Sequence, residues 1–272
     1  MPELPEVETT RRGVEPHVVG RRILELAVHE PRLRWPVPPE LAERVAGARV
    51  IEAARRAKYL LFRLDSGATL LLHLGMSGSL RVLPSATPRK LHDHVDFVLD
   101  SGQTLRFNDP RRFGSLHYTE GDPDEHPLLR RLAPEPLGER FSADYLWRAS
   151  RGRRVAIKQL IMNSAIVVGV GNIYASEALF RAGVRPRRAA DRVTRAQMAR
   201  LVGAIREVLA MAVKVGGTTL RDYVGADGNP GYFRQKLRVY ERAGEPCRTC
   251  GTPIRHAVQG QRSSYWCPSC QT

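Results

Sequence analysis

KYLLFRLDSGATLLLHL, residues 58–74, holds two short apolar runs on either side of the tripeptide Asp65, Ser66, Gly67. Runs of this length are typical of β-strands, and Asp, Ser and Gly together are typical of a tight turn. The stretch therefore predicts two neighbouring strands joined by a turn.

The same pattern extends on both sides, from about residue 22 to residue 118. Further short apolar runs alternate there with turn residues: RRILELAV, ARVIEAARR, HVDFVLD, QTLRFND and GSLHYTE. Closely spaced short strands of this kind predict a β-sandwich or barrel. A leading helix is expected over residues 6–19, with an interruption near Gly13 and Pro16.

The C-terminal half has a helical pattern. Residues 119–138 are rich in proline and acidic residues and mark a boundary. Beyond it, Ser142 and Thr194 are candidate N-caps and Gly183 is a candidate C-cap. Four helices are expected, in the segments FSADYLWRAS, VAIKQLIM, IYASEALFRAG and TRAQMARLVGAIREVLAMAVKV. The predicted fold class is therefore α+β, with several domains.

The composition indicates a polyanionic partner. The 272 residues are 42% hydrophobic, which is enough for one large or two ordinary domains, and their net charge is +15. We find no basic amphipathic helix or lipid anchor, which favours nucleic acid over a membrane. Of the 43 basic residues only five are lysine; arginine suits phosphate, although arginine-rich codon usage explains that ratio equally well. Without a long apolar run or a signal peptide, we expect a soluble cytosolic protein.

All four cysteines lie near the C-terminal end, in the pattern Cys247-x2-Cys250-x16-Cys267-x2-Cys270. Two such pairs supply four thiolates to a tetrahedral ion, which predicts one zinc ion. Two disulfides are the alternative, but nothing in the sequence indicates secretion. Because cysteine takes all four positions, the site is closed, and the zinc is expected to hold a short hairpin together and not to catalyse.

Four further segments are candidates for functional chemistry. GVGNIY, residues 169–174, lacks the third glycine and the βαβ setting of a dinucleotide fingerprint. A turn before a helix, with Asn172 near a phosphate-binding N-terminus, fits better, and a plain helix cap fits as well. HLGMSG (73–78) and NDPRRFG (108–114) fit either turn packing or a wedge inserted into stacked bases. HDHVD (92–96) could imitate a metal site, but simple surface residues are the expectation.

Together these segments carry a family resemblance. The chain resembles the bacterial formamidopyrimidine-DNA glycosylases, base-excision repair enzymes for oxidised purines. The resemblance covers nearly the whole chain in colinear order, through PELPEVET, RRAKYLL, HLGMSGSLR, HDHVD, DPRRFG, VVGVGNIYASEALF, GGTTLRD, GYFRQ and the EPC…C finger. The sister family, endonuclease VIII, typically begins PEGPE and prefers oxidised pyrimidines, so PELPE favours the purine enzyme.

The resemblance implies a bifunctional glycosylase and abasic-site lyase with one structural zinc ion. Its nucleophile would be the amine of Pro2 once Met1 is removed, and Glu3 would be the proton donor. Glu6 matches a supporting acid, Lys58 a phosphate contact and proton donor for elimination, and Arg262 a phosphate contact and proton donor for the second elimination. The implied domains are a catalytic β-sandwich (1–133), a helix-two-turn-helix domain with a lesion-recognition loop (134–235) and a zinc finger (236–272).

The resemblance also implies how double-stranded DNA with an oxidised purine is held by a monomer. Met76, Arg111 and Phe113 match the residues that fill the space left by the flipped base. The remaining matches are phosphate or loop contacts: His92, Arg112, Asn172, Thr218, Thr219 and Arg221. Two positions depart from the family pattern: Asn163, where Asp is common, and Arg221, where Lys is common. A non-catalytic zinc-dependent DNA-binding protein stays an alternative, because charge, zinc and the helical region fit it equally well.

Overall fold

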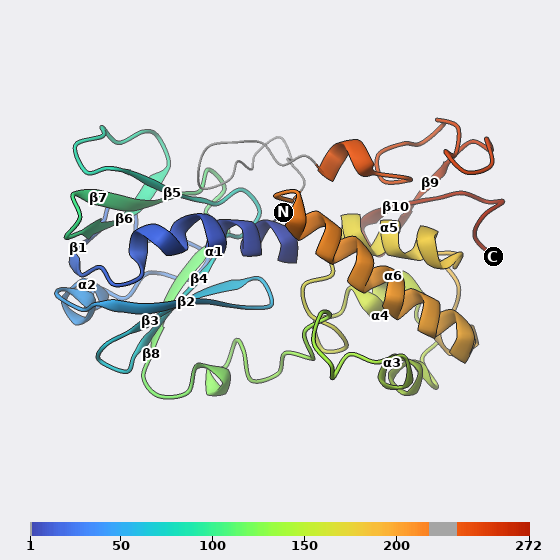
Figure 1. Cartoon of the computed structure of the whole chain (residues 1–272), viewed down its shortest axis with the longest axis horizontal. Helices are drawn as coiled ribbons and strands as arrows, with labels where there is room; N and C mark the ends of the chain where they lie inside the picture. The colour runs from blue at the N-terminus through green and yellow to red at the C-terminus, as the bar shows by residue number, and fades with distance from the viewer. Residues whose placement is uncertain (1, 218–232) are drawn as a thin grey trace. The chain divides into compact units, whose positions relative to one another are not determined.

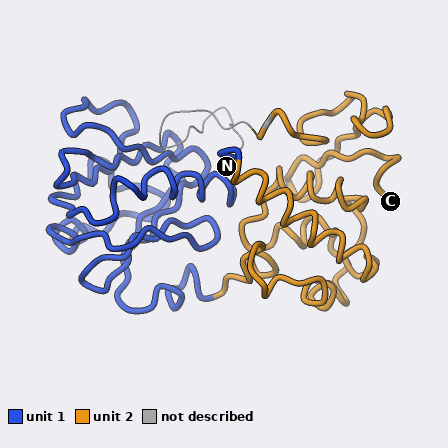
Figure 2. Tube along the Cα trace, viewed as in Figure 1, with its two compact units in different colours: residues 1–130, 215–232 blue, residues 131–214, 233–272 orange. Residues whose placement is uncertain are grey.

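The structure is a computed structural model that describes residues 2–217 and 233–272. The chain divides into two compact units, residues 1–130 with 215–232 (unit 1) and residues 131–214 with 233–272 (unit 2) (Figure 2). The predicted loop residues Thr218, Thr219 and Arg221 fall outside the described residues, as does Met1. Over the described ranges, no helix is long and apolar enough to cross a membrane.

Unit 1 contains two antiparallel four-stranded sheets (Figure 1). The order in one is β1-β6-β7-β5, and in the other β2-β3-β4-β8. The 58–74 stretch forms the predicted hairpin, and Gly67 supplies a positive φ of 85° in its turn. The strands are β1 (Ile23–Val28), β2 (Val50–Arg56), β3 (Tyr59–Leu64), β4 (Thr69–His73), β5 (Ser79–Pro84), β6 (Asp93–Leu99), β7 (Gln103–Asn108) and β8 (Ser115–Thr119).

The two sheets share one hydrophobic core, which confirms the predicted β-sandwich. Phe62 and Leu70 come from one sheet, Phe97 and Phe107 from the other, and all four are almost fully buried in the same cluster. Alternating side chains of each strand reach this interior because successive residues of a strand point to opposite faces. The short helix α2 (Leu41–Val45) adds its two buried ends to the cluster.

Helix α1 (Leu4–Val18) is continuous, so the predicted interruption near Gly13 and Pro16 is wrong. Its buried face, which includes Val7, Val14 and Val18, belongs to the unit 1 core. Burying that face outweighs the cost of about 1 kcal/mol for a glycine inside a helix. Pro16 lies in the last turn of the helix, near its C-terminal end.

Helix α1 also protects the sheet edges. It packs against β2, β3 and β5, and β2 and β5 are edge strands of the two sheets. Unpaired strand edges invite unwanted pairing, and a covering helix prevents it. The N-terminal residues are thereby tied to both sheets.

Unit 2 contains the four predicted helices, and the three predicted caps are confirmed. Ser142 Oγ accepts a hydrogen bond from Tyr145 N, and Thr194 Oγ1 accepts one from Gln197 N. Gly183 ends its helix with a left-handed φ of 68°. The helices are α3 (Ala143–Ser150), α4 (Ile157–Ile161), α5 (Asn172–Ala182) and α6 (Arg195–Lys214). Short 3-10 turns lie at Ala190–Arg192 and Phe233–Lys236 in this unit, and at Pro123–Glu125 in unit 1.

The C-terminal segment of unit 2 forms an antiparallel hairpin of β9 (Arg255–Gln259) and β10 (Arg262–Trp266). Gly260 and Gln261 both have positive φ, at 55° and 60°, as a tight two-residue turn requires. The hairpin lies between the two cysteine pairs in sequence, where the zinc-finger prediction placed it.

Candidate active site and DNA-binding surfaces

The first residues of unit 1 are fixed against the sandwich. Pro2 is buried, and the side chains of Glu3 and Glu6 are 3% and 1% exposed. Glu3 has an extended backbone before α1, and its N–H donates to Glu6 Oε2 at 2.9 Å. A carboxylate in the first turn that accepts from the cap residue is half of a capping box and is favoured by the helix dipole. Glu6 therefore positions the backbone that carries Pro2 and Glu3.

Gly217 lies directly beside Glu6. Its φ is 78°, and a Cβ there would lie 3.0 Å from Glu6 Oε1 and 3.2 Å from Glu6 Cγ. Both the left-handed backbone and the close approach require glycine. The segment that leads to residues 218–232 therefore begins against the acid that holds the N-terminus.

Lys58 lies in the turn between β2 and β3, after Ala57, whose φ is 54°. Arg55 links this turn to α1: its Nη1 donates to Ala57 O at 2.8 Å, and its Nε donates to Glu8 Oε2 at 3.2 Å. Burial raises the pKa of Glu8, but Arg11 and Arg12, with Arg55 nearby, outweigh burial, so the net pKa is lowered. The charged Glu8 thus couples the Lys58 turn to the helix that begins after Pro2 and Glu3.

Met76, Arg111 and Phe113 lie in two loops of the sandwich. The first loop joins β4 to β5, and the second joins β7 to β8. Phe113 is 43% exposed, Arg111 is exposed and Met76 is half-buried. The Arg111 guanidinium lies 4.9 Å from the centre of the Phe113 ring, a cation–π distance. An exposed aromatic ring with an arginine beside it suits insertion into a base stack.

Buried Asp109 joins these two loops, which we call the wedge loops (residues 74–78 and 109–114). Its Oδ1 accepts from Ser77 Oγ at 2.6 Å and from Arg111 N at 3.3 Å, and its Oδ2 accepts from Gly114 N at 2.7 Å. Ser77 Oγ also accepts from Arg111 N, at 3.2 Å. A fully buried carboxylate with several donors fixes its partners strongly, because leaving any of them unpaired is costly.

The wedge loops also fit together without space for a side chain at Gly75. Its φ is 66°, and a Cβ there would overlap the backbone of Phe113 and Gly114. The two loops are therefore set in place by packing as well as by Asp109, before any ligand binds.

Of the predicted phosphate contacts, Arg112 lies within the second wedge loop and His92 lies beside its first residue. His92 has a left-handed φ of 72°, and its carbonyl accepts from Asp109 N at 3.0 Å. Arg112, with φ of 54°, makes an ion pair with Glu30 at 3.3 Å. A phosphate bound by Arg112 would share the guanidinium group with the carboxylate of Glu30.

The HDHVD segment is not composed of simple surface residues. His94 and Asp96 are both 6% exposed. Asp96 holds Arg106 through two hydrogen bonds of 2.8 and 3.0 Å, and His94 Nε2 lies 2.8 Å from Asp109 O. The expectation of surface residues fails because polar partners cover these side chains: His29 and Arg106 contact Asp96 on the face of β6 opposite to the core residues Val95 and Phe97.

The four cysteine sulfurs of unit 2 form one cluster in which all ligand atoms lie within 4.8 Å of one another. The Cys247–Cys270 and Cys250–Cys267 sulfurs are 3.9 and 3.4 Å apart, far beyond a disulfide bond. Four sulfurs around zinc at about 2.3 Å would be about 3.8 Å apart, so the set fits tetrahedral zinc. Among the described residues, no second group of three or more such ligands is present. The chain therefore holds one structural zinc ion, as predicted.

Arg262 begins β10 and is exposed at the end of the hairpin. Two buried residues hold this hairpin and the segment that precedes it. Lys158, 1% exposed on α4, donates to Ser263 O at 2.7 Å and Ser264 Oγ at 2.8 Å. Glu177 on α5 accepts the N–H groups of residues 238–240 at 2.9 to 3.0 Å, and burial raises its pKa. Lys158 therefore fixes β10 against α4, and Glu177 fixes residues 238–240 against α5.

Asn172 is the first residue of α5, after Gly171 as the cap. Its Oδ1 is buried and has no hydrogen-bond partner in the part of the chain that the structure describes. The side-chain amide at this helix N-terminus is therefore not fully used by the protein. At the other end of the turn, Asn163 Oδ1 accepts from Ala165 N at 2.9 Å. Asparagine thus supplies the acceptor that an aspartate would supply there.

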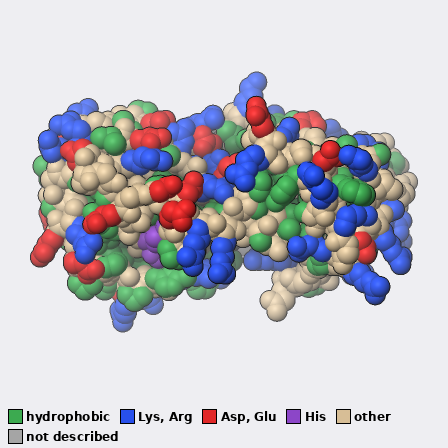
Figure 3. Space-filling model, turned by 90° about the horizontal axis from the view of Figure 1, so that it is seen from below, with side chains coloured by type: hydrophobic (Ala, Val, Ile, Leu, Met, Phe, Trp, Pro, Cys, Tyr) green, Lys and Arg blue, Asp and Glu red, His purple; other side chains and the backbone are tan. Residues whose placement is uncertain are grey.

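Lys and Arg side chains outnumber Asp and Glu on the face of unit 2 that Figure 3 shows. On the same view unit 1 carries both signs. This distribution agrees with the excess of positive charge in the sequence and with a polyanionic partner.

Four residues with structural roles, Asp109, Arg55, Lys158 and Glu177, were not predicted from the sequence. Each is a charged residue within an otherwise apolar or turn segment. That position was the available signal, because a charge inside an apolar run must be paired when the run is buried.

Comparison with known families accounts for both units. A family model described as the formamidopyrimidine-DNA glycosylase N-terminal domain matches residues 1–116, and the H2TH domain of the same enzymes matches residues 132–224. The zinc finger found in FPG and IleRS matches residues 244–272. The chain belongs to the formamidopyrimidine-DNA glycosylase family. A curated formamidopyrimidine-DNA glycosylase from Thioalkalivibrio sulfidiphilus is 63% identical over 100% of both chains.

Solved structures of the formamidopyrimidine-DNA glycosylase family have the same fold. The MutM (Fpg) protein of Thermus thermophilus is 42% identical and covers 99% of this chain and 98% of its own, with a TM-score of 0.89. A Lactococcus lactis Fpg mutant in complex with a Fapy-dG containing DNA is 31% identical over 100% of both chains, with a TM-score of 0.94. The family resemblance seen in the sequence is confirmed.

Proposed function

We propose that the protein is a bifunctional DNA glycosylase and abasic-site lyase that removes oxidised purines, chiefly 8-oxoguanine and formamidopyrimidines. One observation carries the proposal: Pro2 and Glu3 are buried and adjacent, and Glu6 fixes them at the start of α1 through the 2.9 Å bond to Glu3 N. A fixed N-terminal proline beside a buried acid is arranged for covalent chemistry.

Pro2 would be the nucleophile after removal of Met1. A free α-amine has a pKa of about 7.7 to 8, against about 10.4 for lysine, so its unprotonated fraction at neutral pH is a few hundred times larger. The Pro2 nitrogen attacks C1′ of the damaged nucleotide, and the electron pair of the glycosidic bond leaves with the base. Glu3 protonates the sugar ring oxygen as the ring opens, and nitrogen and C1′ are then joined as an iminium.

The iminium makes the C2′ proton acidic. Loss of that proton expels the 3′ phosphate, and a second elimination expels the 5′ phosphate. Lys58 is proposed to contact a phosphate and supply a proton during elimination, and Arg262 to do so for the second step. The Arg55 bridge between Glu8 and the Lys58 turn supports this role, because it ties Lys58 to the helix that starts after Glu3.

The wedge loops would hold the DNA open while the damaged base is outside the stack. Unstacking costs a few kcal/mol, and inserted Met76 and Phe113 offset part of that cost. Arg111 would donate hydrogen bonds to the unpaired cytosine. The buried contacts of Asp109 support this role because they set both loops before DNA arrives.

The remaining contacts are assigned from the family pattern. Phosphates would be held by His92, Arg112, Asn172 and Arg262. Thr218, Thr219 and Arg221, outside the described residues, would belong to the loop that covers the flipped base. We propose that this work divides among residues 1–133, 134–235 and 236–272, in a monomer acting on double-stranded DNA in the cytoplasm.

The substrate class is supported by what the relatives bind. Structures of the Lactococcus lactis Fpg hold DNA with a Fapy-dG lesion or with an abasic site. An abasic site is the product of base removal and the substrate of the lyase step, which suits both activities of the proposal.

Borohydride trapping tests the proposal. Protein freed of Met1 and mixed with a duplex carrying 8-oxoguanine opposite cytosine should form a covalent complex when borohydride reduces the iminium. Glu3→Gln should slow base release more than it weakens DNA binding. A processed protein that traps nothing, or Pro2→Gly that traps as much as wild type, would contradict the mechanism. A non-catalytic DNA-binding protein would bind the duplex and never trap.

An endonuclease VIII-like activity on oxidised pyrimidines is the second candidate. One observation favours it: the Lactococcus lactis Fpg has also been solved with an oxidized pyrimidine containing DNA. Initial rates on 8-oxoguanine and thymine glycol duplexes of the same sequence separate the two. An enzyme for oxidised purines should cleave the 8-oxoguanine duplex faster. Faster cleavage of the thymine glycol duplex would instead indicate an enzyme for oxidised pyrimidines.

A further inference from the structure

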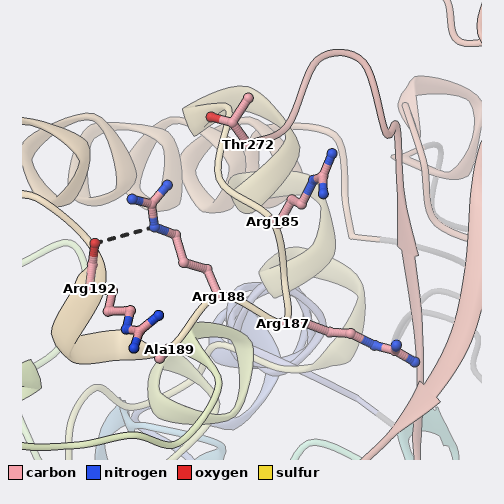
Figure 4. A pocket seen from close by; sticks show the side chains of 6 residues that line it. All are labelled: Arg185, Arg187, Arg188, Ala189, Arg192 and Thr272. Carbon is pink, nitrogen blue, oxygen red and sulfur yellow. Dashed lines mark hydrogen bonds between the residues drawn. The ribbon is translucent and has the colours of Figure 1, made fainter.

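Four arginines surround a recess in unit 2 that the proposed function does not use. Arg185, Arg187, Arg188 and Arg192, with Ala189 and Thr272, line a volume of about 580 Å³ (Figure 4). All four come from one short segment between α5 and α6.

Two of these arginines are held in position by backbone carbonyls. Arg185 Nε donates to Gln271 O at 2.8 Å, and its Nη2 donates to Pro268 O at 3.1 Å. Arg188 Nε donates to Arg192 O at 3.3 Å, the dashed line in Figure 4. Fixing the side chains in advance lowers the entropy lost when a ligand binds.

No acidic side chain of the described residues pairs with the arginines of this recess, and the main chain of Thr272, which also lines it, accepts from Arg185 N at 3.1 Å. The arginines on either side of the segment are paired, Arg181 with Glu207 and Arg195 with Asp144. None of the four recess arginines makes an ion pair with Asp or Glu within residues 2–217 and 233–272. Their hydrogen bonds leave most guanidinium N–H groups available, and each guanidinium can bind an oxyanion with two parallel hydrogen bonds.

The recess lies away from the two proposed DNA contacts of the same unit. Asn172 is the first residue of α5 and Arg185 follows the end of that helix, whose 11 residues span about 16 Å. Arg187 lies 5.7 Å from the ring of Trp266, the last residue of β10, whereas Arg262 is the first. A five-residue strand spans about 13 Å between its first and last residues. Two elements therefore separate the recess from the lesion-binding surface.

We propose that the Arg185–Arg192 recess is a second anion-binding site that takes a phosphate-rich ligand while the lesion duplex is bound. The ligand is either the backbone of a second nucleic acid segment or a free polyphosphate. Phosphate is favoured over carboxylate because four guanidinium groups without an acidic partner line one recess, and a phosphate-rich ligand carries several charges to pair with them. The separation of the two sites rests on the proposed function, which places the lesion duplex at Asn172 and Arg262.

The test uses the zinc-loaded full chain saturated with a duplex that carries a tetrahydrofuran abasic analogue. A short, labelled, undamaged duplex is then added, and its binding is followed by fluorescence anisotropy. Arg187→Ala with Arg192→Ala is the informative variant, because neither side chain makes a hydrogen bond in the described part of the chain. The matched control is Arg21→Ala with Arg148→Ala, two exposed arginines that remove the same charge elsewhere.

Wild type should bind the second duplex, and the recess variant should bind it about tenfold more weakly. The log–log salt slope of the variant should be smaller by about 0.9 for each phosphate that it no longer neutralises. The control should change binding less than twofold. Displacement of the duplex by sodium tripolyphosphate would identify free polyphosphate as a ligand, and no displacement would identify nucleic acid.

Three results would overturn the proposal: no second binding, equal loss in the control, or better displacement by oligoglutamate than by phosphate. Incision of an 8-oxoguanine duplex by the same proteins is measured in parallel. It should be equal in wild type and the recess variant, and its absence in wild type would count against the proposed function and not against the recess.

Discussion

The wedge loops of unit 1 and the zinc hairpin of unit 2 are both short exposed structures assigned to DNA, but they are held differently. Asp109 fixes the wedge loops through three hydrogen bonds from protein groups, and both loops connect strands of one sandwich. The hairpin depends on four thiolates that need an ion. One surface is therefore complete when the chain folds, and the other must first acquire a metal.

The hairpin also shows that shaping and docking are separate tasks. The zinc cluster closes the two cysteine pairs, whereas Lys158 and Glu177 hold the neighbouring backbone against α4 and α5. The wedge loops need no equivalent docking because they connect strands of the sandwich and Asp109 joins them to each other.

Removal of zinc should give the largest effect, and it should disrupt only the zinc hairpin of unit 2. Structural zinc contributes on the order of 10 kcal/mol to the folding of small zinc domains. A chelator, or Cys247→Ala, should abolish protection of residues 255–266 in hydrogen exchange and weaken DNA binding at least a hundredfold. Residues 59–73 should keep their protection. Loss of protection in both regions would show that the two units are not independently stable.

Asp109→Ala should have the next largest effect, and it should disrupt the wedge loops of unit 1. It leaves Ser77 Oγ, Arg111 N and Gly114 N without their buried acceptor, which should cost about 3 kcal/mol. Urea unfolding followed in unit 1 measures this loss. Glu43→Ala, at an exposed acid of α2, should change stability by less than about 0.5 kcal/mol. Equal losses in the two variants would remove Asp109 from its assigned role.

Phe113→Ala should separate the function of the wedge loops from their contribution to stability. The ring is 43% exposed, so stability should change by about 0.5 kcal/mol or less. Base release should fall about tenfold, since part of the compensation for unstacking is lost. Cleavage of a preformed abasic site should fall less. Leu24→Ala, 56% exposed on β1, is the control. A similar loss in Leu24→Ala would mean that Phe113 has no wedge role.

Glu8→Gln should have the smallest effect. The folded pKa of Glu8 is lowered from 4.5, so its charge stabilises the fold at neutral pH. That contribution is lost as the pH falls below 4.5 toward the lower folded value. The variant should be less stable than wild type by under about 1 kcal/mol at pH 7, because the Gln amide oxygen still accepts hydrogen bonds from the neighbouring arginines, and the difference should shrink in acid. Unfolding curves across this range would contradict the assignment if the difference grew in acid.

The sequence predicted the parts of the fold that depend on local signals. The 58–74 hairpin, the Ser142 and Gly183 caps and the zinc cysteines follow from turn residues, cap preferences and spacing. The continuity of α1 through Gly13 was missed, because burial of its apolar face overrides a local helix-breaking preference.

The missed site residues have a common physical reason. Asp109 and Lys158 act through partners that are 32 and 105 residues away in sequence, Ser77 Oγ and Ser263 O. A single sequence shows that a charge stands within an apolar segment, but the partner is defined only when the strands and helices come together. Pro2 and Glu3 could be proposed from the sequence because the motif PELPEVET, which carries the family resemblance, is contiguous along the chain.

Mapping the reduced covalent adduct tests the central claim most directly. Protein freed of Met1 is trapped on an 8-oxoguanine duplex with borohydride, digested, and sequenced by mass spectrometry. We expect the deoxyribose remnant on the nitrogen of Pro2, in the peptide that begins Pro2-Glu3-Leu4. An adduct on Lys58 or any other lysine, with an unmodified Pro2, would contradict it.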